Sequence, residues 1–158
     1  MRAVTLRHPW AYAVKMLGKD IENRTWDPGV SLKVGERFAI HAGKPPRANS
    51  CAASDFAYWS EIAEALDWIE SVGIVVPRPL TPRMMLDAGA SAIVAVATFG
   101  GTVRSSPSRW FVGPFGWLLA DVRALAAPVP CRGAQGLWAI PPDVEAHVAA
   151  QIAEVPHE

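Results

Sequence analysis

The sequence predicts an α+β domain with a small closed or partly closed β-barrel, flanking helices and a helical insertion. Short apolar segments with the alternation of strands occur six or so times between turn signals rich in Gly and Pro. Two or three longer segments have the spacing of amphipathic helices. The 158 residues are 51% hydrophobic and 19% charged, which suits one globular domain with its own core. We therefore expect a single domain over residues 1–158.

Strands are predicted where apolar and polar residues alternate between turn signals. In the first such segment, Val4 and Leu6 alternate with Thr5 and Arg7. The segment that begins at Ala92 is apolar on both faces and therefore predicts a central strand, with a bulge at its Gly pair. The strands that we expect are residues 1–7, 30–33, 37–42, 92–103, 117–123 and 137–140.

Helices are predicted at three main places. The first helix follows Pro9, which suits a first helical turn, and Gly18 is its expected left-handed stop. The clearest helix covers residues 54–72, where an apolar stripe is opposed by acidic residues that we expect to face solvent. The last helix covers residues 143–154, and a shorter helical turn is expected at 83–88.

The charges are balanced over the whole chain but not along it. The net charge is zero, which argues against a broad electrostatic grip on a nucleic-acid backbone. Residues 1–50 nevertheless hold nine Lys and Arg against four Asp and Glu, whereas residues 51–70 hold five acids and no base. The amino-terminal third is therefore suited to holding an anion locally.

Several classes of protein are not expected. Cys51 and Cys131 lie 80 positions apart, and neither has a second Cys or His at metal-binding spacing. The sequence therefore predicts no disulfide framework, no metal site and no cofactor. No apolar run has the length of a membrane span, and the amino terminus lacks the apolar core of a signal peptide. We expect a cytoplasmic protein without a membrane partner.

Residues 18–26 are the stretch that a purely structural explanation fits least well. Strand alternation would put Glu22, Arg24 and Trp26 on one side. A carboxylate, a guanidinium and an indole can accept hydrogen bonds, donate several and stack a flat ring, which are the needs of a nucleobase site. The plainer interpretation is a solvated turn with an exposed ion pair.

A second candidate lies at the end of the strand at residues 37–42. His41 and Lys44 bracket Gly43 there and make a compact corner that favours an anion. The alternative is that His41 is a core histidine with one satisfied nitrogen.

Three segments together resemble one family, the ASCH (activating signal cointegrator homology) domain of the PUA-like superfamily. The most specific feature is a core of Gly, Lys, Glu and Arg, present here as Gly18, Lys19, Glu22 and Arg24. The resemblance covers roughly residues 3–44 and 92–140. The matching segments are His8-Pro9-Trp10 with residues 18–26, Ile40-His41-Ala42-Gly43-Lys44, Gly116-Trp117 and Gly133-Ala134-Gln135-Gly136-Leu137-Trp138.

The resemblance implies a PUA-like β-barrel whose mouth holds RNA, single-stranded nucleic acid or a modified base, with residues 45–91 as an insertion. Some relatives are enzymes: one branch deacetylates N4-acetylcytidine with a Lys, a Thr and a Glu, and another cleaves RNA. Lys19 matches the catalytic Lys of the deacetylases. Glu22 stands where their Thr would be, and the strand at residues 92–103 has no acid.

Three interpretations of the charged stretch follow. We expect first a binding module for RNA, single-stranded nucleic acid or a nucleotide. The alternative is a hydrolase, an amidohydrolase or ribonuclease, in which Lys19 is the general base and Glu22 orients it. The third is a structural ion pair between Glu22 and Arg24. The ligand-binding residues that we expect to converge are Trp10, Lys19, Glu22, Asn23, Arg24, Trp26, His41 and Lys44.

Overall fold

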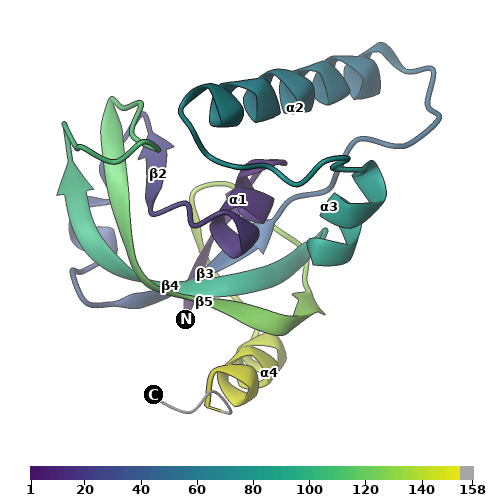
Figure 1. Cartoon of the computed structure of the whole chain (residues 1–158). Helices are drawn as coiled ribbons and strands as arrows, with labels where there is room; N and C mark the ends of the chain where they lie inside the picture. The colour runs from purple at the N-terminus through teal and green to yellow at the C-terminus, as the bar shows by residue number, and fades with distance from the viewer. Residues whose placement is uncertain (154–158) are drawn as a thin grey trace.

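The computed structural model describes residues 1–153 and shows an α+β fold (Figure 1). Within these residues six strands form one sheet that curls strongly into a half-barrel, and four α-helices pack around it. The predicted α+β class is therefore confirmed, and the half-barrel is compatible with the partly closed barrel that we expected. In chain order the elements are β1 (Arg2–Leu6), α1 (Trp10–Met16), β2 (Ile21–Arg24), a short 3-10 helix (Gly29–Ser31), β3 (Arg37–Ala42), α2 (Ala53–Ser71), α3 (Pro82–Ala88), β4 (Ala92–Val103), β5 (Phe115–Pro130), β6 (Leu137–Ala139) and α4 (Pro142–Ala153).

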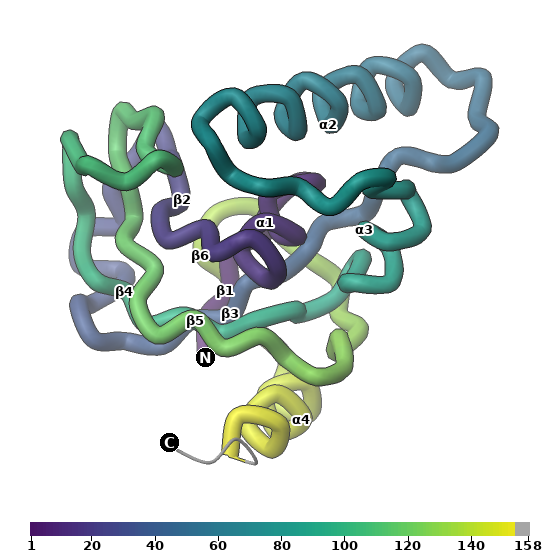
Figure 2. The backbone as a smooth tube through the Cα atoms, viewed as in Figure 1, coloured from purple at the N-terminus to yellow at the C-terminus, as the bar shows by residue number. Residues whose placement is uncertain are grey.

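The sheet is mixed, with the strand order β2-β5-β4-β3-β1-β6. β1 and β3 are parallel, and the other neighbouring pairs are antiparallel. The ladder between β4 and β5 shifts its register at three places, and β3 shifts against β4 after Ile40. Because each such irregularity bends and twists the sheet locally, the two long strands wrap instead of lying flat (Figure 2).

Alternation along the strands divides the core between the two faces of the sheet. Val4 and Leu6 of β1 enter an inner cluster together with Ala11 and Val14 of α1. Ala3, which precedes Val4, points to the other face and enters an outer cluster, which α4 covers. Figure 1 shows the same arrangement, with α1 in the hollow of the curl and α4 on the opposite face. Both faces of the central strands are covered, which explains why β4 is apolar on both sides.

Residues 45–91, the segment expected as an insertion, contribute to a third cluster and do not stand apart from the rest of the fold. α2 buries Ile62, Leu66 and Ile69 against Tyr12 and Ala13 of α1. α1 therefore has the sheet on one side and α2 on the other, and its four residues from Ala11 to Val14 are all buried. The segment expected only as an insertion is thus packed on the helix that leads to the candidate site.

Most predicted elements are confirmed, but the strand predicted at residues 30–33 is wrong. Pro28 begins a 3-10 turn there and Gly29 has a positive φ of 56°. Val30 is 93% exposed, so its apolar side chain has no sheet to pack against. β5 is longer than expected and reaches Pro130. The last helix begins at Pro142, and its predicted end at residue 154 lies outside the described residues.

Candidate functional site

The charged stretch is positioned by the end of α1. Gly18 follows the helix with a φ of 72°, which is the left-handed conformation expected of a glycine stop. The Lys19 amide then donates back to the Ala13 carbonyl at 3.2 Å, which turns the chain sharply toward β2. β2 pairs with β5, so Glu22 lies opposite Trp117. This reversal brings the Lys19 side chain beneath the helix instead of into solvent.

Lys19, Glu22 and Arg24 form a chain of charges at the edge of the sheet. Lys19 is only 2% exposed, and its Nζ donates to Glu22 Oε2 at 2.6 Å and to the Ile21 carbonyl. Arg24 Nε lies 3.2 Å from Glu22 Oε1, where the alignment gives an ion pair and not a hydrogen bond. Removing Lys19 alone would therefore leave a buried carboxylate with one cation, which is an unfavourable arrangement.

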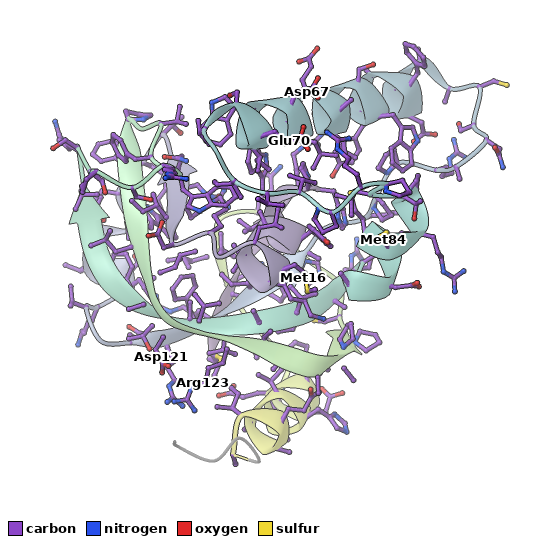
Figure 3. All side chains as sticks on the ribbon, in the orientation of Figure 1. Met16, Asp67, Glu70, Met84, Asp121 and Arg123 are labelled. Atoms are coloured by element: carbon purple, nitrogen blue, oxygen red, sulfur yellow. The ribbon has the colours of Figure 1, made fainter. Side chains whose placement is uncertain are left out.

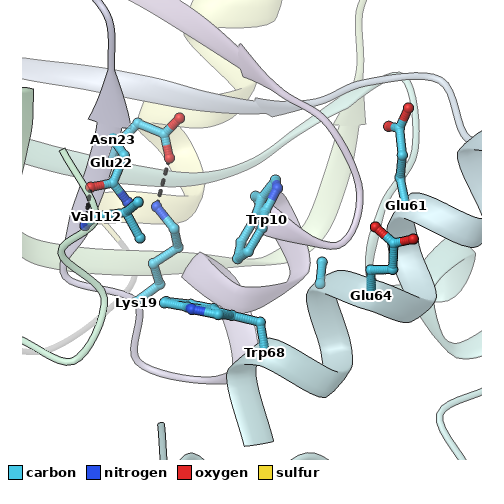
Figure 4. A pocket seen from close by; sticks show the side chains of 9 residues that line it. Trp10, Lys19, Glu22, Asn23, Glu61, Glu64, Trp68 and Val112 are labelled. Carbon is cyan, nitrogen blue, oxygen red and sulfur yellow. Dashed lines mark hydrogen bonds and ion pairs between the residues drawn. The ribbon is translucent and has the colours of Figure 1, made fainter. Parts of the chain in front are cut away.

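The buried pair forms one end of a cavity of about 520 Å³, which we call the aromatic pocket. The indoles of Trp10 and Trp68 meet edge to face with their ring centres 6.0 Å apart. In Figure 4 the two indoles stand between the Lys19–Glu22 pair and two carboxylates of α2. The nine residues that line the pocket are Trp10, Lys19, Glu22, Asn23, Glu61, Glu64, Ala65, Trp68 and Val112.

Asn23 is engaged by the loop that follows β4. Its amide nitrogen donates to the Trp110 carbonyl at 2.8 Å, and its oxygen accepts from the amides of Val112 and Gly113 at 2.8 and 3.0 Å. Three hydrogen bonds from one side chain hold this aromatic loop against β2. Asn23 therefore shapes the rim of the aromatic pocket.

A second, larger cavity of about 930 Å³ lies on the other side of Arg24, and we call it the basic cleft. Four cationic side chains line this cleft together with His41, and no carboxylate does. Lys44 and Arg132 are exposed and have no ion-pair partner among the described residues. The lining comprises Thr5, Arg7, Arg24, His41, Gly43, Lys44, Ser91, Cys131, Arg132, Gly133, Ala134, Gln135 and Gly136.

The two cavities meet at two ion pairs. Glu22 lines the aromatic pocket and its partner Arg24 lines the basic cleft. In the same way Glu61 lines the pocket, and Arg7, 2.9 Å away, lines the cleft. Arg24 also donates to the Thr5 carbonyl at 3.1 Å, a link between β2 at one edge of the sheet and β1. Each ion pair thus joins one cavity to the other.

His41 forms the floor of the basic cleft. Its Nε2 lies 2.7 Å from the Cys131 carbonyl, and its buried Nδ1 has no partner among the described residues. The Gly133 loop lies so close that a β-carbon there would be 2.6 Å from the imidazole. Burial lowers the pKa of His41, although its hydrogen bond to Cys131 opposes that shift. Burial likewise lowers the pKa of His8, whose Nε2 lies 3.0 Å from the Gly43 carbonyl.

The predicted residues are therefore divided between two adjoining cavities and do not all converge on one. Trp10, Lys19, Glu22 and Asn23 line the aromatic pocket, whereas Arg24, His41 and Lys44 line the basic cleft. Trp26 lines neither of them. Its ring lies edge to face on Trp117 at 4.8 Å, and its carbonyl accepts from the Trp117 indole at 3.2 Å.

Sequence reasoning missed several residues that line the two cavities. Glu61, Glu64 and Trp68 come from α2, whose acidic face was expected to be simply solvated. Arg7 and Arg132 of the basic cleft were also not singled out. The one available signal was Trp68, which lies beside the acidic face of α2. A large indole is rarely left fully in solvent, so its position indicated that this face is partly covered.

Comparison of the chain with models of known protein families and with curated proteins finds no match. Within residues 1–153, no cluster of three or more His, Cys, Asp or Glu side chains is arranged to hold a metal ion. None of the helices in this part of the chain has both the length and the apolar character of a membrane span. The two cavities are therefore the features from which a function can be inferred.

Proposed function

We propose that this protein is a PUA-like binding module of the ASCH type that recognises a nucleotide or a short single strand of nucleic acid. The base would enter the aromatic pocket, and the phosphate would lie in the basic cleft. The observation that carries the proposal is the adjacency of the two cavities across the Glu22–Arg24 pair. A nucleotide matches this arrangement, because it joins a flat aromatic base to an anionic phosphate within one small molecule.

The aromatic pocket supplies what base recognition requires. Trp10 and Trp68 offer indole faces, and stacking of one base on an aromatic side chain contributes about 1–3 kcal/mol. Lys19 has three donors as an ammonium, of which the structure uses two, so one remains for a base carbonyl. Glu22 can accept from an exocyclic amine.

The basic cleft supplies the phosphate contacts. Of the four cations of the cleft, Lys44 and Arg132 have no ion-pair partner among the described residues, and they lie on loops around His41. With a net charge of zero, the protein is better suited to a few phosphates than to a long backbone. The proposed ligand is therefore short and single-stranded.

Binding of a short single-stranded RNA, measured by fluorescence anisotropy over a range of salt concentrations, tests this proposal. Lys44→Ala and Arg132→Ala should each weaken binding and lower the salt slope by roughly 0.7, the value expected for one phosphate contact on a single strand. Trp68→Leu should weaken binding without changing the slope. Arg83→Ala is the matched control, because Arg83 is an exposed arginine of α3 that lines neither cavity.

Two results would reject the proposal. The first is an absence of RNA and nucleotide binding even at low salt. The second is wild-type affinity and salt slope in both Lys44→Ala and Arg132→Ala. Equal losses in Arg83→Ala would show that any surface cation contributes, and that the basic cleft is not the site.

Hydrolysis ranks second because of the contacts of Lys19. A general base needs a free lone pair, but both contacts of Lys19 Nζ are with acceptors, which suit the protonated ammonium. We expect wild-type protein to leave N4-acetylcytidine and RNA unchanged. Turnover of either substrate that disappears in Lys19→Ala would reverse this ranking.

A further inference from the structure

The aromatic pocket has a charge that ordinary base recognition does not need. Of the three carboxylates that line it, Glu22 contacts Lys19 and Arg24, and Glu61 contacts Arg7. Glu64 is exposed and has no ion-pair partner among residues 1–153. The cation of Lys19 is neutralised by its buried partner. The pocket therefore presents two indoles and, in Glu64, one carboxylate without a cation against it.

The geometry points to a ligand whose base carries a fixed positive charge, as N-methylated purines do, an inference that rests on the proposed nucleotide site. A delocalised cationic ring is attracted to the face of a Trp more strongly than a neutral ring. The positive charge that methylation of a ring nitrogen creates also makes the N–H groups of the base stronger donors, and a carboxylate such as Glu64 is a matching acceptor. Figure 4 shows Glu64 on the side of the pocket opposite the Lys19–Glu22 pair.

The basic cleft argues for a nucleotide as the source of this cation. A peptide with a methylated lysine would also bring a cation to two Trp rings. Such a peptide would bring no phosphate to the adjoining cleft, where Arg7, Arg24, Lys44 and Arg132 gather. A nucleotide with a cationic base matches both cavities, because its positive end meets Glu64 and its negative end meets the cleft.

Titration calorimetry with two pairs of mononucleotides tests the inference. We compare 7-methylguanosine and guanosine 5′-monophosphates, and 1-methyladenosine and adenosine 5′-monophosphates. The methylated member of each pair should bind about tenfold more tightly, the size expected for a cation–π contact with a partly exposed carboxylate. Glu64→Gln should abolish most of this preference, because the methylated nucleotides should lose more affinity than the unmethylated ones.

Asp67→Asn is the matched control. It removes a carboxylate from the same helix, but Asp67 points away from the pocket and does not line it (Figure 3). This variant should keep the full preference. Trp68→Leu should weaken all four nucleotides, because each of them stacks.

Equal affinity for methylated and unmethylated nucleotides, or a preference that survives in Glu64→Gln, would overturn the inference. Tighter binding of a trimethyl-lysine peptide than of any nucleotide would also overturn it, because the pocket would then belong to a protein partner. If none of the four nucleotides binds while the RNA strand does, the inference fails and the proposed function stands. If the RNA strand also fails to bind, both are rejected.

Discussion

The Lys19–Glu22 pair gives the sharpest test of how the site is held together. Lys19→Met keeps most of the apolar stem but removes the charge, so the change in packing is small. Glu22, which is 7% exposed, then retains only Arg24 at 3.2 Å. The variant therefore isolates the effect of leaving this carboxylate with one of its two cationic partners.

The expected loss follows from the burial of the pair. Removing one partner of a buried ion pair typically destabilises a protein by about 3–5 kcal/mol. Because Arg24 still faces Glu22, we expect the lower end, about 3 kcal/mol of the free energy of unfolding. In Lys19→Met/Glu22→Gln both charges are gone, so the double variant should lose only about 1 kcal/mol.

Urea unfolding followed by far-ultraviolet circular dichroism measures these differences without depending on the nearby Trp residues. A loss below about 1 kcal/mol in Lys19→Met, or a double variant as unstable as the single one, would refute the reasoning. The double variant also separates two interpretations of the pair. If it folds and binds RNA like wild type, Lys19 and Glu22 only stabilise the fold.

Three further outcomes are expected. Ile69→Ala should lower the free energy of unfolding by about 2–5 kcal/mol in a single transition, because Ile69 is fully buried on the inner face of α2; a separate early transition would show that the segment with α2 unfolds independently. Burial lowers the pKa values of His8 and His41, so the unfolded chain binds more protons than the folded chain does. The free energy of unfolding should therefore keep its full value above the ordinary pKa of 6.5 and fall as the pH falls below it. Measured by urea unfolding at several pH values, the free energy of unfolding should change by at most about 1.4 kcal/mol per pH unit for each histidine. His41→Gln should reduce this slope, and an unchanged slope would exclude His41 as its source. Gly133→Ala should weaken RNA binding, because its β-carbon would meet the His41 ring at 2.6 Å, whereas Ala134→Ser should not; equal binding by both would show that the loop is free to move.

The sequence predicted the local parts of the site well, because their geometry depends on neighbours in the chain. Gly18 adopts the left-handed conformation expected of a helix stop, and the motif emerges from the helix end as predicted. Lys19, Glu22 and Arg24 are close enough in sequence for their charges to meet in any tight turn. Trp26 was predicted less well, since β2 ends at Arg24 and strand alternation does not extend to it.

What the sequence could not predict depends on how distant segments pack. Trp68 comes 49 positions after Lys19, and an amphipathic pattern tells which face of a helix is buried but not what that face covers. The division of the predicted residues between two cavities has the same origin. Arg24 and His41 are brought to one cleft by the curl of the sheet, which register shifts between β3, β4 and β5 produce.

The cover that α2 gives determines what the charged stretch at residues 18–26 can do. Without α2, the Lys19–Glu22 pair and Trp10 would face water, where an ion pair contributes about 0–1 kcal/mol and the surrounding charges are screened. Covered by α2, the same pair lies in a region of lower dielectric constant, where hydrogen bonds and charges act more strongly. α2 also brings to the pocket Trp68, its second indole, and Glu64, a carboxylate without an ion-pair partner among the described residues. The motif therefore provides the buried ion pair, and the helix that covers it provides the second indole and the unpaired carboxylate on which the proposed recognition of a base depends.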